Sequence, residues 1–240
     1  MDDSACAMKV GTDSILLGSW AARCLDEYPT SEQYLNGLDI GAGSGLLALM
    51  LSQWAAGKLR ITAVEIDADA ARQANQNVAA SPWPDSIEVV NSDIVVSNNT
   101  LQSTFDVIVS NPPYFSVPHG ETRSQQGFSN PRKVARSETA LTLSSLFAVI
   151  RAKLSTKGLA FIVLPTEQAG AARRVSEQHG LCVQRQLEIR SLPEKPVSRL
   201  CLAYGLTQTT PNIDKLNIYA APNVYTEEYR ALCRAYYLHF

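Results

Sequence analysis

Residues 38–51 read Leu-Asp-Ile-Gly-Ala-Gly-Ser-Gly-Leu-Leu-Ala-Leu-Met-Leu, and this stretch is the strongest indication of the fold class. It closes an apolar strand expected at 34–40, passes through the glycine loop 41–45, and continues as an apolar helix over 46–54. Glycine lets such a loop turn tightly and approach a ligand with no Cβ in the way. A strand, a glycine loop and a helix in this order are typical of doubly wound α/β folds, which bind ligands at the carboxyl ends of their strands.

The spacing of the glycines narrows the choice of ligand. The pattern is G-x-G-x-G, and Leu46 stands where a dinucleotide-binding fingerprint has its third glycine. A phosphate-binding P-loop is excluded because no Gly-Lys-Ser/Thr follows the loop. Taken alone, the glycine loop predicts either a ligand-binding turn of another kind or a purely structural turn.

The rest of the chain alternates between strand-like and helix-like segments, which predicts a parallel sheet with helical crossovers. Strands are expected at 61–66, 87–90, 105–109, 159–164, 183–189 and 199–206, and helices within 8–25, 67–77, 141–154, 168–179 and 225–240. Asp67 is placed to cap the helix that follows the second strand. The last two strands have no helix between them, so they are expected to form an antiparallel hairpin. The predicted fold class is α/β, a doubly wound Rossmann-like sheet, mostly parallel with an antiparallel C-terminal hairpin.

No repeat and no low-complexity linker divides the chain, so we expect one domain over residues 1–240. The polar segment 115–138 is longer than most connections in compact domains and is expected to be an active-site loop. Residues 208–240 are expected to form a C-terminal extension. Thr12 or Asp13 is expected to cap the first helix.

Composition excludes several classes of protein. The 240 residues are 45% hydrophobic and 18% charged, which excludes a disordered chain or a coiled coil. No apolar run reaches the ~18 residues of a membrane helix, and the first residues lack a signal-peptide profile. Five scattered cysteines without a CxxC motif indicate reduced thiols and a cytoplasmic protein. The three histidines are isolated from one another, so no metal site is expected.

Charge is distributed unevenly along the chain. Residues 1–114 hold 5 basic and 14 acidic side chains, whereas residues 115–240 hold 16 basic and 9 acidic ones. The second half could therefore face an anion such as an RNA backbone, although an ordinary solvated surface would look the same. The candidate RNA-binding residues are Arg123, Arg132, Lys133, Arg136, Lys195 and Arg199.

Three acidic residues stand at or near the ends of successive predicted strands. Glu65, near the end of the second strand, could accept both hydroxyls of a ribose. Asp93, after the third, could accept from an adenine amino group, and Asp39, just before the glycines, could meet an ammonium directly or through water. Each acid alone is more often a helix cap or an exposed strand end. Together they predict a ligand with a ribose, an adenine and a positive amino-acid end but no phosphate, which describes S-adenosylmethionine.

A second motif, Asn111-Pro112-Pro113-Tyr114, follows the fourth predicted strand. Two prolines fix the backbone and remove two N–H donors, which leaves carbonyl groups to accept hydrogen bonds. The Asn111 side-chain carbonyl and a proline carbonyl could together accept from one planar NH2 group and orient its lone pair toward a methyl donor. Tyr114 offers a ring on which a flipped-out base could stack. The alternative is a rigid turn with a packing tyrosine.

In this order, GAGSG, Glu65, Asp93 and NPPY resemble the class I S-adenosylmethionine-dependent methyltransferases that modify planar amino groups. Residues 8–21, 130–138 and 225–238, reading MKVGTDSILLGSWA, NPRKVARSE and YTEEYRALCRAYYL, are similar to the bacterial tRNA (adenine-N6)-methyltransferases. This second resemblance covers nearly the whole chain, and its flanking segments are more specific than NPPY. It implies a Rossmann-like methyltransferase fold and methyl transfer to N6 of adenine 37 in the anticodon loop of tRNA1(Val).

The resemblance also assigns roles to residues of this chain. Catalysis falls to the NPPY residues, Asn111, Pro112, Pro113 and Tyr114. S-adenosyl-L-methionine would be bound by Lys9, Gly11, Thr12, Asp39, Gly41, Gly43, Glu65, Ile66, Asp93, Ile94 and Asn111. The partner is tRNA, contacted at its anticodon stem-loop. The family has an extra strand-like stretch before Met8, where this chain has seven residues, so a shortened N-terminus is expected.

Several alternatives share the NPPY motif. They are methyltransferases of guanine N2 in rRNA, of DNA adenine, and of the glutamine amide of proteins. The chain has no room for the additional N-terminal domain of the glutamine enzymes or for the target-recognition domain of the DNA enzymes, so the guanine enzymes compete most closely. A non-enzymatic alternative is an inactive methyltransferase-like binding module, against which the intact Asn111 and Tyr114 argue.

Overall fold

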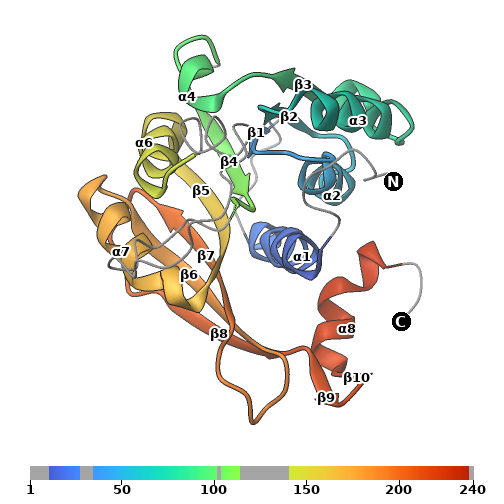
Figure 1. Cartoon of the computed structure of the whole chain (residues 1–240), viewed down its shortest axis with the longest axis vertical. Coiled ribbons are helices and arrows are strands. Elements are labelled where there is room, and N and C mark those ends of the chain that lie inside the picture. Colours follow the sequence, from blue (N-terminus) through green and yellow to red (C-terminus); the bar gives the residue numbers. More distant parts are fainter. Residues whose placement is uncertain (1–10, 28–34, 102–103, 114–140, 238–240) are drawn as a thin grey trace, which may run out of the picture.

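An eight-stranded sheet forms the centre of the structure, a computed structural model that describes residues 11–27, 35–101, 104–113 and 141–237 (Figure 1). The strands lie in the order β3-β2-β1-β4-β5-β7-β6-β8. Their bounds are β1 (Leu35–Ile40), β2 (Leu59–Glu65), β3 (Ile87–Asn91), β4 (Phe105–Ser110), β5 (Leu154–Pro165), β6 (Cys182–Arg190), β7 (Arg199–Gly205) and β8 (Asn212–Asn217). The first five strands are mutually parallel, whereas β7 pairs antiparallel with both β5 and β6.

Helices cover both faces of this sheet (Figure 1). On one face lie α1 (Thr12–Asp26), α2 (Leu46–Trp54), α3 (Ala68–Ala79) and α8 (Glu227–Cys233). On the other lie α4 (Ile94–Ser97), α6 (Leu143–Lys153) and α7 (Ala169–Gln178). The remaining short elements are η1 (Pro84–Ser86), η2 (Thr166–Gln168), η3 (Arg234–Tyr236), β9 (Tyr219–Ala221) and β10 (Val224–Tyr225).

The central strands are apolar on both sides because each face is covered by helices. Side chains of a strand point alternately to opposite faces. In β4, Val107 and Val109 accordingly belong to the core under α1 and α2, while Ile108 belongs to the core under α6. Phe161 and Ile162 of β5 divide between the two cores in the same way. Continuous apolar runs such as these are typical of strands in a doubly wound sheet.

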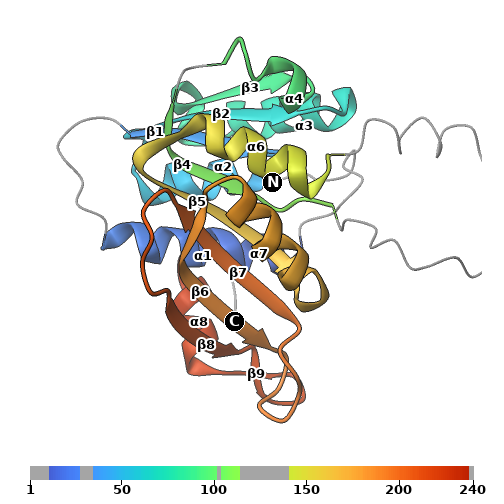
Figure 2. The same cartoon turned by 90° about the vertical axis from the view of Figure 1, so that its left-hand side faces the viewer.

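The strand order reverses at β1, and this position locates the site. β1 pairs in parallel with β2 on one side and with β4 on the other, so Asp39 lies opposite both Ala63 and Val109. The carboxyl ends of β1, β2 and β4 therefore lie side by side at one edge of the sheet. Figure 2 shows the sheet running from β3 at the top to β8 near the bottom, with α1 crossing beside its middle. Ligands of doubly wound sheets bind at such a reversal point.

Most of the predicted elements are confirmed, including the parallel strands and the antiparallel pairing of β6 with β7. The predicted cap of the first helix is wrong. Gly11 is the N-cap of α1 and has no side chain to accept a hydrogen bond, whereas Thr12 and Asp13 lie inside the helix and Asp13 accepts from Arg199. The predicted helix 225–240 is shorter, with α8 ending at Cys233. Asp67 caps α3 as predicted, accepting from Asp69 N at 3.0 Å.

Strands β8, β9 and β10 were not predicted. β8 reads Asn-Ile-Asp-Lys-Leu-Asn, which is too polar to suggest a strand, and it becomes one by pairing in parallel with β6 at the edge of the sheet. The predicted loop 115–138 lies outside the described residues.

Candidate cofactor and substrate site

The glycine loop between β1 and α2 has a backbone that other residues rarely adopt. Gly41, Gly43 and Gly45 have φ values of 72°, 54° and 81°, in the left-handed region. A Cβ built on Gly41 or Gly43 would meet no atom within 4 Å, whereas one on Gly45 would touch Ala74. The first two glycines thus border open space at the carboxyl edge of the sheet, where a ligand could approach the backbone.

Hydrogen bonds hold this loop in place. The N–H groups of Gly41 and Ala42 both donate to the carbonyl oxygen of Val64, at 2.9 and 3.1 Å. On its other side, Asn77 Nδ2 of α3 donates to the Ser44 carbonyl at 2.9 Å. The loop is therefore attached to both β2 and α3.

Asp39 is fully buried at the end of β1. Its Oδ2 accepts from Ala48 N at 3.1 Å, in the first turn of α2, where the N-cap Gly45 has no side chain to do so. Its Oδ1 is buried and has no hydrogen-bond partner within the part of the chain that the structure describes. Burial raises the pKa of Asp39 to about 7; the charge of Glu65 adds to this rise, and the bond from Ala48 opposes it. An unpaired buried acceptor of this kind is suited to a cationic or hydrogen-bond-donating ligand.

Glu65 joins the glycine loop to the end of β2. Its Oε2 accepts from Gly43 N and its Oε1 accepts from Asp67 N, both at 2.8 Å. A carboxylate oxygen has two lone pairs, so each oxygen can still accept one hydroxyl of a ribose. Asn91 Nδ2 supports this strand end by donating to the carbonyls of Glu65 and Ile66, at 2.9 and 3.2 Å.

The predicted adenine contacts lie at the ends of β2 and β3. The Asp93 carboxylate caps α4 through a 2.8 Å bond from Val95 N, which leaves part of its acceptor capacity for a ligand. The side chain of Ile66 is 53% exposed and offers an apolar surface. Ile94 packs into the core instead, so its backbone is the part able to contact a ligand, and its exposed apolar neighbours are Val95 and Val96.

Taken together, these groups fit S-adenosylmethionine. The open glycine backbone and the unpaired Oδ1 of Asp39 provide space and an acceptor for a positive amino-acid end. Glu65 retains acceptor capacity for a ribose, and Ile66 provides apolar surface for an adenine. Among the described residues of this set there is no cationic side chain, which makes them a poor site for a phosphate.

The NPPY motif begins where β4 ends. Asn111 is half-buried, Pro112 is buried and Pro113 is exposed, while Tyr114 lies outside the described residues. Asn111 Nδ2 donates to Ser14 Oγ of α1 at 2.8 Å. Among the described residues, nothing donates to Oδ1 of Asn111. Because β4 is the neighbour of β1, this acceptor lies at the same sheet edge as the glycine loop.

Gly11 and Thr12 are exposed at the start of α1. They precede Asp13 and Ser14, whose side-chain hydrogen bonds attach this helix to the sheet. Asp13 accepts from Arg199 Nε at 3.0 Å, so this candidate RNA-binding arginine is already engaged in an ion pair. Lys195 is exposed in the turn before β7, at the same edge of the sheet. The other candidates lie outside the described residues; they are Lys9, Arg123, Arg132, Lys133 and Arg136.

Three residues of this site were not predicted from the sequence: Ser14, Asn77 and Asn91. The side chains of Ser14 and Asn91 donate or accept hydrogen bonds that support the predicted residues Asn111 and Glu65, and Asn77 holds the predicted glycine loop at Ser44. Ser14 does lie inside the MKVGTDSILLGSWA segment, so the resemblance marked its neighbourhood. Nothing in its spacing indicated a contact with a residue 97 positions away.

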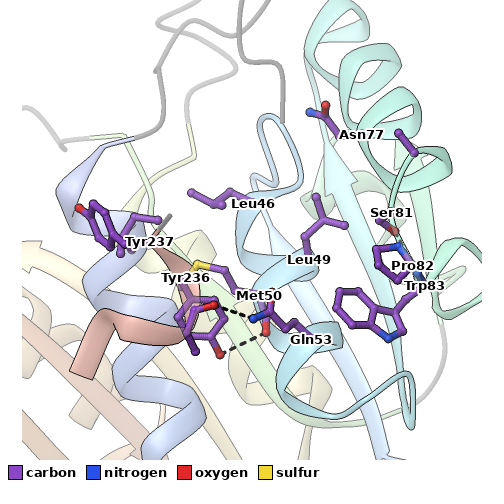
Figure 3. Close-up of a pocket in the computed structure, with 13 residues that line it drawn as sticks. Leu46, Leu49, Met50, Gln53, Asn77, Ser81, Pro82, Trp83, Tyr236 and Tyr237 are labelled. Carbon is purple, nitrogen blue, oxygen red and sulfur yellow. Dashed lines mark hydrogen bonds between the residues drawn. The ribbon is translucent and has the colours of Figure 1, made fainter. Parts of the chain in front are cut away.

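A separate pocket of about 470 Å³ lies between α2, the turn after α3 and the C-terminal segment (Figure 3). Its walls include Leu49 and Gln53 of α2, Trp83 and Tyr236. Gln53 Nε2 donates to the Ala235 carbonyl at 2.7 Å, and this bond attaches the C-terminal segment to α2. None of the predicted site residues lines this pocket.

The described residues contain neither a membrane-spanning helix nor a metal-binding cluster. No helix there is long and apolar enough to cross a bilayer. No group of three or more His, Cys, Asp or Glu side chains within the described ranges could hold a metal ion.

Comparison with known proteins identifies the family of this chain. The sequence profile of the family described as "Methyltransferase small domain" matches residues 21–174. A tRNA1(Val) (adenine(37)-N6)-methyltransferase of Pseudoalteromonas translucida (strain TAC 125) is 38% identical over 234 residues, which cover 97% of this chain and 93% of that protein. A protein of the same name from Bacteroides thetaiotaomicron is 39% identical over 234 residues, covering 98% of this chain and 92% of the relative.

Among solved structures, a predicted O-methyltransferase from Agrobacterium tumefaciens is similar with a TM-score of 0.63. The match covers 93% of this chain and 96% of that one at 15% identity, and it supports the fold alone.

Proposed function

This chain belongs to the methyltransferase small domain family, and we propose that it transfers a methyl group from S-adenosylmethionine to N6 of adenine 37 in the anticodon loop of tRNA1(Val). The shared name of its full-length relatives suggests the nucleic acid and the base. The structural observation that carries the proposal is the half-buried Asn111 at the end of β4. Its Oδ1 remains able to accept, next to a glycine loop suited to the methyl donor.

The acidic half of the chain would hold the cofactor. Glu65 would accept the ribose hydroxyls with the lone pairs that Gly43 and Asp67 leave unused. The unpaired Oδ1 of Asp39 would accept from the ammonium, directly or through water. When bound, S-adenosylmethionine supplies a methyl group that its sulfonium activates for transfer. This activation requires neither a metal nor a base. The rigid loop keeps these contacts in register because β2 and α3 already fix it.

Asn111 and Pro112 would bind the target amine. An exocyclic amine is a poor nucleophile because its lone pair is delocalised into the ring. Hydrogen bonds from its two N–H groups to Asn111 Oδ1 and to the Pro112 carbonyl would orient it and leave electron density facing the methyl donor. The nitrogen loses its proton after transfer, so no general base is needed. We further propose that Tyr114 stacks on the flipped base.

The RNA would approach along the same edge of the sheet. Lys195 is exposed there, and the basic segment that follows Tyr114 in the sequence would add charge. Each neutralised phosphate would release a counterion and make binding depend on salt. A tRNA substrate also places the enzyme in the cytoplasm.

The test uses bulk RNA from a bacterial strain that lacks its tRNA1(Val) adenine-37 methyltransferase. The purified protein is incubated with this RNA and isotopically labelled S-adenosylmethionine, and the nucleosides of each RNA fraction are analysed. Labelled N6-methyladenosine at position 37 of tRNA1(Val) is expected, and Asn111→Ala is the matched inactive control. Labelled N2-methylguanosine in rRNA would replace the proposal with a guanine methyltransferase. Absence of label from all RNA, with cofactor binding intact, would favour a binding module.

A further inference from the structure

The first turn of α1 contacts the end of β4 through one side-chain hydrogen bond. Asn111 Nδ2 donates to Ser14 Oγ at 2.8 Å. Both side chains are half-buried, and neither makes another side-chain hydrogen bond among the described residues. Ser14 reaches the one residue whose orientation matters most to the proposed reaction, yet it lies in a helix far from NPPY in the sequence.

An asparagine side chain carries a donor and an acceptor on one planar group. When the NH2 end faces Ser14, Oδ1 necessarily points away from α1, toward the open edge of the sheet. If the amide turned by half a revolution, the Ser14 hydroxyl could donate to Oδ1, but the NH2 would then face the target amine and two donors would oppose each other. The rate of transfer therefore depends on which end of this amide faces α1.

We propose that Ser14 is a positioning residue, which accepts the hydrogen bond from Asn111 Nδ2 and thereby keeps Oδ1 facing the amine to be methylated. The kinetic part of this inference rests on the proposed function, whereas its geometric part rests on the Ser14–Asn111 contact alone. The neighbouring Asp13 is paired with Arg199, which fixes the turn from which Ser14 projects.

Four single variants and one double variant distinguish a role of Ser14 in orienting the Asn111 amide from a role in stabilising the fold. Ser14→Ala removes the acceptor, while Ser14→Thr retains a hydroxyl at the same position. Ser19→Ala is the matched control, because Ser19 lies buried on the same helix more than one turn away. Asn111→Asp places an oxygen at both ends of the side chain, so turning it over no longer changes what the amine meets. The double variant combines Ser14→Ala with Asn111→Asp.

Transfer is measured in single turnovers at saturating cofactor and tRNA. Ser14→Ala should slow transfer by about tenfold, while the Kd for S-adenosylmethionine and the KM for tRNA stay within about twofold of the parent. Ser14→Thr and Ser19→Ala should both remain within about twofold of the parent rate. In the Asn111→Asp background, Ser14→Ala should lower the rate of transfer by less than about twofold, because Ser14 affects the rate through the orientation of residue 111.

A measurement without turnover tests the hydrogen bond directly. In the ¹⁵N–¹H spectrum of the cofactor-free protein, the side-chain amide of Asn111 is the pair that Asn111→Asp removes. One of its two proton resonances should move upfield in Ser14→Ala and stay in place in Ser19→Ala. Resonances that remain unchanged in Ser14→Ala would overturn the proposal even if the enzyme were active.

Other results would overturn the proposed role of Ser14 or the proposed function. A parent-like rate for Ser14→Ala, or a tenfold loss that persists in the Asn111→Asp background, would exclude an orienting role for Ser14. A loss of cofactor affinity that matches the loss of rate would make Ser14 a support of the cofactor site instead. If Ser14→Ala shows the expected amide shift but the parent protein methylates no RNA, the proposed function is refuted and the geometric part of the inference stands.

Discussion

Arg199 Nε donates a hydrogen bond to Oδ2 of Asp13 at 3.0 Å, and this contact joins the start of β7 to the first turn of α1. The two side chains are 30% and 22% exposed, so water only partly screens the pair. Because Ser14 follows Asp13 directly, the pair also fixes the turn that contacts Asn111. Arg199 is therefore a structural partner of the site in this fold, whatever further contact it makes with RNA.

Arg199→Ala should lower the free energy of unfolding by about 1 kcal/mol, since a charge-assisted bond is lost at a partly exposed site. It should also slow methyl transfer, because the first turn of α1 loses an anchor. Denaturant unfolding and single-turnover rates measure the two effects. Arg72→Ala is the control: Arg72 pairs with Asp69 on the surface of α3, and its loss should change neither quantity appreciably. If Arg199→Ala changed only the salt dependence of tRNA binding, Arg199 would be an RNA contact and not an anchor.

Glu65→Ala should weaken binding of S-adenosylmethionine by at least about tenfold, since it removes the ribose acceptors and the carboxylate that accepts from Gly43 and Asp67. Calorimetric titration gives the affinity. Glu88→Ala serves as control, because Glu88 is exposed on the neighbouring strand β3. The ribose assignment fails if Glu65→Ala binds the cofactor as tightly as Glu88→Ala.

Asp39 should make stability depend on pH. Its pKa is raised from 3.8 to about 7 in the folded protein. Between these two pH values, Asp39 is protonated in the folded state and ionised in the unfolded state. Stability should then fall as pH rises through this window, by at most about 1.4 kcal/mol per pH unit, and level off above about pH 7. Asp39→Asn, which stays neutral, should lack this slope.

Denaturant unfolding of both proteins across this pH range, without cofactor, measures the difference. Asp39→Asn should gain stability relative to the parent as pH rises. Parallel pH profiles for parent and variant would mean that Asp39 is ionised in the folded state across the whole window.

Asn111→Ala should abolish most of the transfer while leaving cofactor binding largely intact. The loss of one oriented acceptor of the target amine is expected to slow the chemical step by ~10²–10³. Calorimetry and single-turnover kinetics at saturation distinguish the two roles assigned to this residue. Lost cofactor affinity with normal chemistry at saturation would move Asn111 to the cofactor site alone.

Lys195→Ala should reduce the salt dependence of tRNA binding. Loss of one phosphate contact lowers the slope of log affinity against log salt by roughly 0.7–0.9. Lys58→Ala is the control, because Lys58 is equally exposed but precedes β2 at the opposite edge of the sheet. Binding is measured at several salt concentrations. Equal slopes for the two variants would direct the search for the RNA path to Arg132 and Lys133.

A site for a nucleotide-type ligand could be predicted from local sequence patterns. The alternation of apolar strands and helices predicted a doubly wound sheet, and GAGSG with its flanking strand predicted where a ligand would approach. Glu65, Asp93 and Asn111 could be named because each stands at or just after the end of a strand that the pattern reveals, and parallel strands bring such positions to one edge. All of these signals are local: they depend on neighbouring residues and on the periods of helix and strand.

The contacts that hold those residues in place are visible in the three-dimensional structure alone. Ser14 meets Asn111 across 97 positions and Asp13 meets Arg199 across 186. Both contacts exist because α1 packs across the sheet with its first turn over the ends of β4 and β7. The polar strand β8 likewise forms only because β6 offers it an edge. Such contacts depend on strand order and helix placement, which arise from burying two apolar faces at once and leave no mark in the spacing of the residues concerned.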